Sequence, residues 1–490
     1  MSHVLSVDQS TQGTKALLFD ASGALICRRD VAHEQIISAD GWVSHDPEEI
    51  YRNTLEAVRL VLTESGVNPG EIAAFGISNQ RETSVCWDRT TGKPIANAIV
   101  WQCGRAKELC QRVMDAGWSE QVRKATGIPI SPFFPASKFA WLVENIPGAK
   151  EKAAQHELCF GTIDTWLVYC MTGGQSYKTD YSNASRTQLF NIHSLAWDRE
   201  ICTAFGLNAD DLAEVTDSDG VFGATDLNGL LPKQVPICGV LGDSHAALFG
   251  QGCLDNGMAK ATYGTGSSIM MNIGEAPIES RNGLVTSLAW KYRGVVNYVM
   301  EGNLNYTGAV IRWIEKDLGL AKASETQALA ESANPDDTTY LVPAFTGLGA
   351  PYWNNDAKAM ICGITRLTGK AELVKAGLDC IAYQITDIVK AMEQDTGRKL
   401  SQLRVDGGPT RNGYLMQLQS DLLDAQVMIP SSEELSGIGA AYMAGLTAGV
   451  YNDDIFGAMK RTAYEPAKEE PVRAKKYTGW LDAVHTVIGK

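Results

Sequence analysis

The sequence predicts an α/β protein made of two lobes with a central cleft, each lobe built on a mixed β-sheet of the RNase H-like type. Near the start, three antiparallel strands precede a helix and a parallel strand, an order that does not fit a Rossmann unit. The second half of the chain repeats the opening hairpin. In addition, 490 residues are too many for one core. We place the boundary near residue 250, which gives lobes of residues 1–250 and 251–490.

The elements of the first half follow from alternation and turn chemistry. Residues 4–8, 15–20 and 24–27 alternate or run apolar and are separated by polar, glycine-containing turns, so they are predicted to be strands. Residues 47–65 place apolar side chains on one side of a helix. The apolar run at 72–77 is then a strand parallel to the first.

The second half is expected to begin with another hairpin, formed by strands at 258–263 and 268–272. A strand at 294–300 and a helix from about 304 to 317 follow. Residues 400–405 alternate again and lead into a glycine-rich turn. Both halves therefore contain a hairpin turn of the size that holds a phosphate.

Composition excludes several classes of protein. A net charge of −14 argues against nucleic acid or an anionic membrane as the main partner, although it does not disfavour ATP, which is recognised locally. The first residues have no basic or apolar region of the signal-peptide type, and no apolar run of 18 residues occurs, so we expect a cytoplasmic protein that is neither secreted through a signal peptide nor inserted in a membrane. Its 11 cysteines form no CxxC pair and its 7 histidines show no ligand spacing, so structural zinc is not expected.

Asp243 is the strongest candidate for a catalytic residue. It ends the apolar run 235–241, and the glycine-threonine turn 263–268 follows about 20 residues later. A carboxylate at a strand end can take the proton of an attacking hydroxyl, while N–H groups of such a turn hold the phosphate under attack. The alternative is an ordinary Gly-Asp turn. His245 is a second, weaker candidate for a base and is expected to be a pocket wall.

The first hairpin turn has the composition of a phosphate site. Asp8 ends a strand and would hold Mg²⁺ through water, and Lys15 can reach a phosphate. Gly13 is expected to supply unusual backbone angles. Polar hairpins are also common without any ligand, so the repetition of the turn in the second half carries the prediction.

Three further features favour a small-molecule site. Arg81 and Glu82 directly follow a predicted strand, where a guanidinium and a carboxylate can bind vicinal hydroxyls, although such a pair is usually only a solvated surface pair. Trp101 offers an apolar face for a carbon chain, although a tryptophan is more often core. The turn at 406–412 places two glycines before a helix start, which allows a flat or anionic ligand to approach.

Taken together, these residues resemble the FGGY family of carbohydrate kinases, and most closely its members that phosphorylate glycerol. The resemblance runs from about residue 4 to 451. It is carried by four long segments and by a family signature at 133–145 that includes Lys138 and Trp141. The four segments are 79–83, 97–103, 180–187 and 342–353.

The resemblance implies a fold of the actin/hexokinase/Hsp70 ATPase type, with ATP, Mg²⁺ and a polyol or sugar in the cleft. Asp243 would be the general base, Arg81, Glu82 and Trp101 would hold the polyol, and Asp8 would lie near Mg²⁺. A homo-oligomer is the default in such a family. The nucleotide would be lined by Thr11, Gln12, Lys15, Thr265, Gly308, Arg312, Gly408 and Asn412.

Departures from the family pattern bear on the substrate. Phe133 replaces a tyrosine, Ser244 a glutamine and Ser268 a phenylalanine among the residues around the substrate. These changes remove glycerol-specific contacts and make room, so we predict a four- or five-carbon polyol or ketose of the xylulose type. The alternative substrate is glycerol itself. An actin-like ATPase and an inactive sugar sensor are the alternatives of another class.

Overall fold

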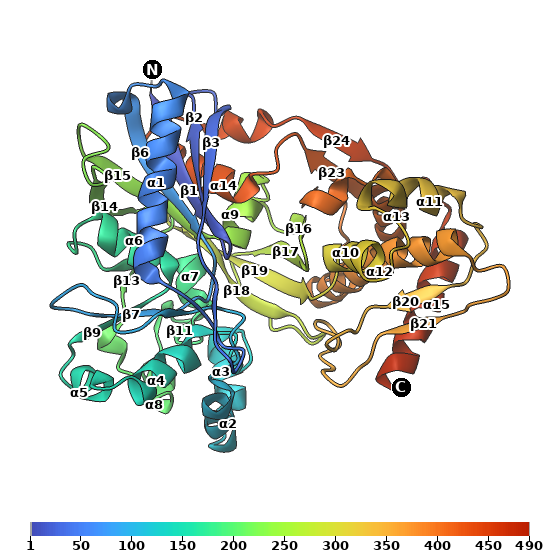
Figure 1. Cartoon of the computed structure of the whole chain (residues 1–490), viewed down its shortest axis with the longest axis horizontal. Coiled ribbons are helices and arrows are strands. Elements are labelled where there is room, and N and C mark those ends of the chain that lie inside the picture. The colour runs from blue at the N-terminus through green and yellow to red at the C-terminus, as the bar shows by residue number, and fades with distance from the viewer. Residues whose placement is uncertain (1, 490) are drawn as a thin grey trace.

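The computed structural model describes residues 2–489 and has one large mixed sheet in each half of the chain (Figure 1). In the first sheet, β1 pairs antiparallel with β2 and parallel with β6, as the sequence predicts. The strand order is β14 (Val221–Thr225), β15 (Val235–Gly242), β6 (Ile72–Asn79), β1 (His3–Gln9), β2 (Gly13–Phe19) and β3 (Leu25–Ala32).

The second sheet repeats this arrangement, with an antiparallel hairpin next to two parallel strands. Its order is β18 (Val285–Tyr292), β19 (Val295–Leu304), β17 (Ser267–Gly274), β16 (Ala259–Tyr263), β22 (Gln402–Asp406), β23 (Gln426–Pro430) and β24 (Arg461–Tyr464). The predicted hairpin at 258–272 is thereby confirmed. The two-lobed α/β fold of the actin/hexokinase type is confirmed as well.

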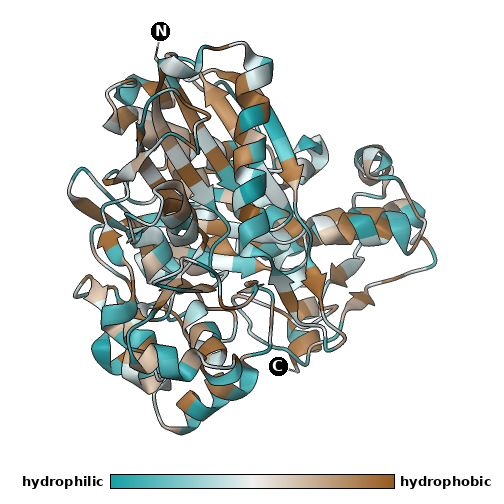
Figure 2. Cartoon of the chain, turned by 60° about the vertical axis from the view of Figure 1, so that its left-hand side comes forward, coloured by the Kyte–Doolittle hydropathy of each residue, from teal (hydrophilic) through white to brown (hydrophobic). Residues whose placement is uncertain are grey.

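Helices cover both faces of the first sheet. Helix α1 (Pro47–Ser65) has the predicted bounds and buries Ile50, Val58 and Leu62. Figure 2 shows the strands of this sheet largely apolar and the outer side of α1 largely polar. Helix α14 (Leu435–Thr447), although late in the chain, packs on the opposite face against β1, β6 and α9 (Asp243–Gly250).

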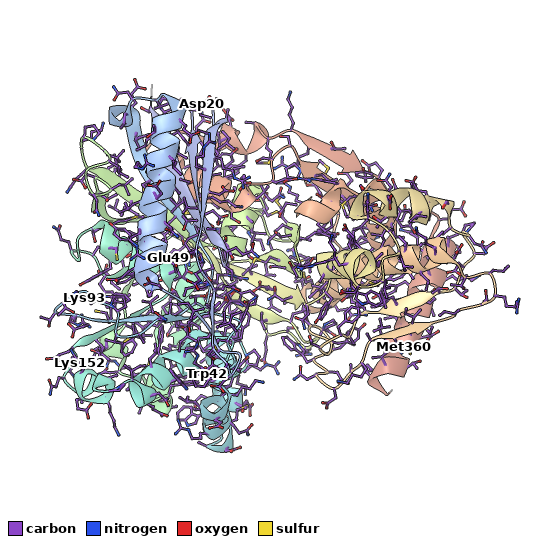
Figure 3. All side chains as sticks on the ribbon, viewed as in Figure 1. Asp20, Trp42, Glu49, Lys93, Lys152 and Met360 are labelled. Carbon is purple, nitrogen blue, oxygen red and sulfur yellow. The ribbon has the colours of Figure 1, made fainter. Side chains whose placement is uncertain are left out.

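A long insertion between β6 and β15 forms the lower part of the first lobe in Figure 1. Lys93 and Lys152 project from it, whereas Met360 marks the outer side of the second lobe (Figure 3). The elements of this insertion in the first lobe are β7 (Val85–Asp88), β8 (Ala98–Ile99), α2 (Lys107–Asp115), α3 (Ser119–Thr126), α4 (Pro135–Asn145), α5 (Ala149–Ala154), β9 (Leu158–Gly161), α6 (Ile163–Met171), β10 (Lys178–Asp180), α7 (Tyr181–Ser185), β11 (Phe190–Asn191), β12 (Ala196–Trp197), α8 (Arg199–Ala204) and β13 (Glu214–Thr216). Strands β4 (Ile36–Ile37) and β5 (Val43–His45) join β8 in a small sheet.

In the second lobe, the 27-residue helix α12 (Lys370–Thr396) is the central element against which other helices pack. The others are α10 (Gly308–Lys316), α11 (Thr326–Ser332), α13 (Gly413–Leu423) and α15 (Glu470–Ile488), with the hairpin β20 (Tyr340–Val342) and β21 (Met360–Cys362). None of the described helices combines the length and apolar character needed to cross a membrane.

Two details differ from the sequence expectations. The helix predicted to start near residue 304 starts at Gly308, because Leu304 still belongs to β19 and pairs with Ser267. Gly13 does not have a positive φ. A glycine is required there because a Cβ atom would lie 2.5 Å from the carbonyl oxygen of Val31 on the neighbouring strand.

Candidate active site

The predicted base and the predicted metal residue lie at one edge of the first sheet. Asp8 pairs with Ser78, and Ser78 pairs with Leu241, so the carboxyl ends of three adjacent parallel strands coincide. Asp243 begins α9 directly after β15. Ligands of open α/β sheets bind beyond the carboxyl ends of such strands. Chain topology thus brings Asp8 and Asp243 together although 235 positions separate them.

The carboxylate of Asp243 is held on one oxygen and free on the other. Its Oδ1 lies 3.1 Å from Nε of Arg81 and accepts a hydrogen bond of 2.6 Å from the backbone N–H of Ser244. Its Oδ2 accepts no hydrogen bond from a described residue, and the side chain is 37% exposed. An oriented carboxylate with one free oxygen that solvent can reach has the geometry of a general base.

Arg81 is fixed by a carboxylate from the other lobe. Glu301, on β19, is fully buried and accepts hydrogen bonds of 3.1 and 2.9 Å from the two Nη atoms of Arg81. Arg186 lies 2.9 Å from the same carboxylate, and Ser268 donates to it at 3.0 Å. Burial alone would raise the pKa of Glu301, but the two guanidinium groups outweigh burial and hold that pKa well below its ordinary value.

Glu82 occupies a strained position next to Arg81. Its φ of 61° is in the left-handed region, which non-glycine residues rarely adopt. The ammonium group of buried Lys138 donates to the Glu82 carbonyl at 3.2 Å and also to the Phe133 carbonyl. Nε of Arg186 donates to the Glu82 carboxylate at 2.7 Å. Contacts on both the backbone and the side chain thus hold Glu82 in a conformation that it would otherwise avoid.

Trp101 links the predicted substrate wall to the first phosphate turn. Its indole Nε1 donates to Oγ1 of Thr11 at 2.9 Å. Its ring meets Phe133 edge to face, with centroids 5.5 Å apart, so the two rings form a continuous apolar wall. The tryptophan is only partly buried, and one part of its surface remains available to a ligand.

His245 does not have the properties of a base at neutral pH. It is fully buried, and neither ring nitrogen has a hydrogen-bond partner among the described residues. Burial lowers its pKa well below the ordinary value, and the neighbouring charge of Arg81 lowers it further. His245 therefore stays neutral and is part of the wall behind Arg81.

Asp8 lies in a chain of charges that runs across the first turn. Ser78 donates to its Oδ1 at 2.9 Å, and Nζ of Lys15 lies 3.7 Å from Oδ2. Lys15 also pairs with Glu434, just before α14, at 3.0 Å. Burial raises the pKa of Asp8 to about 6; the charge of Asp243 adds to this effect, and Lys15 opposes it.

The described residues contain no group of three or more potential metal ligands. Mg²⁺ that accompanies nucleotide phosphates needs only one or two protein carboxylates and keeps several waters. Asp8 and Asp243 are close enough for the charge of one to raise the pKa of the other, and they meet this requirement. When bound, the ion would supply charge neutralisation at the transferred phosphate.

The two hairpin turns both offer unpaired backbone donors. The N–H groups of Thr11, Gln12, Thr265 and Gly266 donate to no described residue. The second turn is fixed from behind, because the N–H of Gly308 donates to the Gly264 carbonyl at 2.9 Å. Free N–H groups on a rigid turn are suited to phosphate oxygens.

The remaining nucleotide candidates differ in how well they are placed. Gly408 has open space around it, and Asn412 caps α13 through a 3.0 Å bond from the N–H of Leu415, as the sequence predicted. Arg312 and Gln12 are exposed, and neither side chain forms a hydrogen bond with a described residue. Their contact with a nucleotide stays a prediction.

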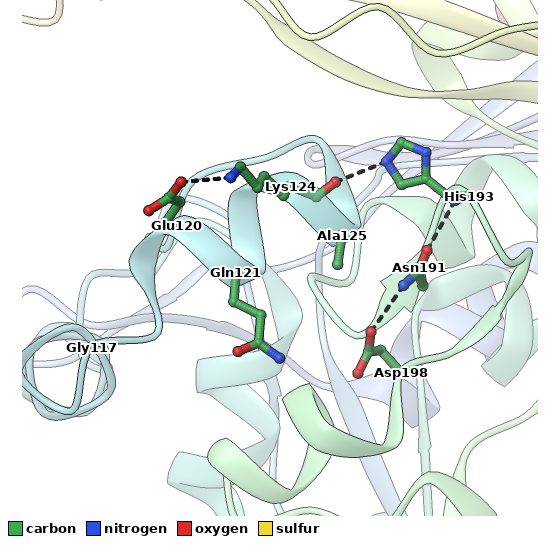
Figure 4. Close-up of a pocket in the computed structure, with 8 residues that line it drawn as sticks. All are labelled: Gly117, Glu120, Gln121, Lys124, Ala125, Asn191, His193 and Asp198. Atoms are coloured by element: carbon green, nitrogen blue, oxygen red, sulfur yellow. Dashed lines mark hydrogen bonds and ion pairs between the residues drawn. The ribbon is translucent and has the colours of Figure 1, made fainter.

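A broad hollow of about 630 Å³ lies outside this site, between α3 and the loop around residue 193 (Figure 4). Its polar groups are paired with each other: Lys124 with Glu120 at 2.6 Å, and Asn191 with Asp198 at 3.0 Å. Because its charged groups are already paired and none of the predicted site residues lines it, this hollow is not a candidate for the active site.

Residues 3–250 match the N-terminal domain of the FGGY family of carbohydrate kinases, and residues 259–448 match its C-terminal domain. The chain belongs to the FGGY family of carbohydrate kinases. It is therefore a phosphotransferase with an alcohol group as acceptor, which confirms the predicted class of enzyme and excludes the actin-like ATPase.

The chain is 46% identical to "Glycerol kinase 1" of Thermotoga maritima over 490 residues, which cover 99% of each protein. It is also 46% identical to the glycerol kinase of Carboxydothermus hydrogenoformans over 486 residues, 98% of this chain and 97% of that one. The crystal structure of Plasmodium falciparum glycerol kinase with ADP is similar at 34% identity, with a TM-score of 0.94 and coverage of 99% and 98%. Xylulose kinase of Lactobacillus acidophilus (20% identity, TM-score 0.89, coverage of 100% and 99%) shows the fold alone.

Three residues that fix the site were not among the sequence candidates: Glu301, Arg186 and Glu434. Arg186 lies in the segment 180–187, one of those that carried the family resemblance, which was the one available signal for it. Glu301 and Glu434 lie 220 and 419 positions from their partners Arg81 and Lys15, so no local pattern indicates the pairing.

Proposed function

We propose that this chain is a glycerol kinase, which transfers the terminal phosphoryl group of ATP to a terminal hydroxyl of glycerol. Sequence identity of 43–46% to curated glycerol kinases along nearly the whole chain favours this substrate over the predicted four- or five-carbon substrate. Xylulose kinases are similar only at about 20% identity, a level that supports no substrate assignment.

The observation that carries the proposal is the free Oδ2 of Asp243 beside an oriented Arg81. In this reading Oδ2 removes the proton from the glycerol hydroxyl as that hydroxyl attacks the phosphate. Arg81 and Glu82 hold the other hydroxyls, and the Trp101–Phe133 wall covers the carbon chain. The free N–H groups of the two turns hold the phosphates of ATP.

The departures that pointed to a longer substrate have another reading. The hydroxyl of Ser268 donates its proton to Glu301, so it offers no free donor to an extra substrate hydroxyl. Phe133 retains an aromatic ring against Trp101, so the apolar wall persists without the tyrosine hydroxyl. Neither residue therefore adds a free hydrogen-bond donor that would select a longer polyol.

A coupled assay of ADP release across glycerol, erythritol, the common pentitols, xylulose, ribulose and dihydroxyacetone tests the proposal. Glycerol should have the highest kcat/KM. A pentulose or tetritol that exceeded glycerol by tenfold or more, an advantage of roughly 1.4 kcal/mol, would overturn the assignment to glycerol and restore the longer substrate.

A further inference from the structure

A second hollow, of about 190 Å³, lies at the amino-terminal ends of β16 and β22. Its wall includes Asn256, Gly257, Arg398, Lys399 and Arg404. The opposite, carboxyl ends of the same two strands lead into the second phosphate turn and the turn at Gly407. The hollow is therefore separated from the candidate active site by the length of the sheet.

Two guanidinium groups meet at this place without a counter-charge. Arg461, on β24, donates to the Gln251 carbonyl at 2.9 Å, and Nη1 of Arg404 donates to the same oxygen. Neither arginine forms an ion pair with any described residue. Burial lowers the pKa of Arg461, and the charge of Arg404 lowers it further. Nε of Arg461 is buried and has no hydrogen-bond partner in the described part of the chain.

The mouth of the hollow adds positive charge. Arg398 is exposed and lies along Gly257, with its Cδ 3.7 Å from where a Cβ on that glycine would be. It also forms no ion pair with a described residue. Lys399 is partly neutralised by Asp424 at 2.9 Å. An excess of cations is thus gathered around one small hollow.

This clustering is unusual in a chain whose net charge is −14. Several surface arginines elsewhere are paired with carboxylates, such as Arg59 with Glu56 and Arg293 with Asp453, whereas Arg398, Arg404 and Arg461 have no such partner among the described residues. Asp406, at the far end of β22, lies against Lys260 and leaves the guanidinium pair uncompensated. Guanidinium groups with free donors bind oxyanions well, often with two parallel hydrogen bonds.

We propose that this hollow is a binding site for a phosphate-type anion, either inorganic phosphate or the phosphate group of a small metabolite. Arg404 and Arg398 contact the anion, and Arg461 lies behind them and loses its uncompensated repulsion when the anion binds. Gln251, which both inner arginines hold, begins the segment of residues 251–258 that leads from α9 to β16. An anion bound there therefore stiffens the connection between the two sheets.

Calorimetric titration of the whole chain with inorganic phosphate tests the site. Saturation beforehand with a non-hydrolysable ATP analogue and glycerol fills the phosphate positions of the active site, so any remaining heat reports another site. We expect one phosphate per chain, and affinity at least tenfold weaker in Arg398→Gln and in Arg404→Gln. Arg366→Gln is the matched control, because that exposed arginine lies far from the hollow in sequence and forms no ion pair with a described residue.

Three results would overturn the proposal: no phosphate heat in the wild-type chain, unchanged affinity in Arg398→Gln, or loss of binding in equimolar chloride. Arg398→Gln decides the matter if Arg404→Gln fails to fold, since Arg398 is exposed. A parallel titration with methyl phosphate identifies the source, because tighter binding of the ester points to a phosphorylated metabolite and tighter binding of phosphate to the free ion. None of these readouts depends on which polyol the chain phosphorylates.

Discussion

The clearest consequence of the inter-lobe network concerns Glu301. The substitution Glu301→Gln keeps the shape of the side chain but removes its charge. Arg81 then faces a neutral amide in place of the carboxylate that accepts from both of its Nη atoms. Because Arg81 is held less firmly, it also positions Oδ1 of Asp243 less firmly. A hydrogen bond to a charged group contributes about 1.5–3 kcal/mol, and about 1.4 kcal/mol corresponds to a factor of ten in rate.

Loss of one such bond predicts a fall in kcat/KM for glycerol of roughly 10- to 100-fold. Steady-state kinetics of ADP release measure it, and circular dichroism checks that the variant is folded. Glu315→Gln, on the partly exposed side of α10, is the matched control and should retain full activity. A kcat/KM of Glu301→Gln within twofold of the wild-type value would refute the view that Glu301 positions Arg81.

Three further predictions follow from single contacts. The pKa of Asp8 is about 6 in the folded chain, above its ordinary value of 3.8. Between these two values the folded chain retains a proton that the unfolded chain loses, so the stability of the fold falls as pH rises from about 4 to about 6. The melting temperature of the wild type should thus drop relative to that of Asp8→Asn between about pH 4 and pH 7; parallel curves would contradict this. Gly308→Ala places a Cβ 2.5 Å from the Gly264 carbonyl oxygen, which should shift the second turn and raise KM for ATP roughly tenfold. Gly457→Ala is the control and should leave KM for ATP unchanged, because a Cβ on Gly457 would meet no other atom. Trp101→Phe removes the 2.9 Å bond to Thr11 and should lower kcat/KM roughly two- to tenfold, and an unchanged value would show that the bond is dispensable.

The sequence predicts the residues at strand ends well. Asp8 and Arg81 follow two apolar runs that are expected to pair in parallel, so their common edge can be deduced from the sequence. Asp243 follows a third apolar run, whose place beside the second is known only from the structure. The hairpin turns could be recognised because glycine and hydroxyl residues interrupt alternating strands. These are local signals, and each depends on a few neighbouring residues.

What the sequence could not predict depends on long-range pairing. Glu301 follows no local rule that marks it as the partner of Arg81, since the contact arises only when the second sheet packs against the first lobe. The late start of α10 has the same origin, because pairing of Leu304 with Ser267 overrides the helical pattern. The surroundings of Ser268 could not be read from the sequence for a similar reason. Ser268 counts as a free hydroxyl in the sequence, but in the fold it is bound to Glu301.

The most direct test of the central claim is the activity of Asp243→Asn. The amide keeps the contacts of Oδ1 but cannot remove a proton, so kcat with glycerol should fall by about 10²- to 10⁴-fold. Binding of glycerol and of a non-hydrolysable ATP analogue, measured by calorimetry, should stay within about threefold of the wild-type affinities. A kcat within tenfold of the wild type, with binding intact, would contradict the assignment of Asp243 as the general base.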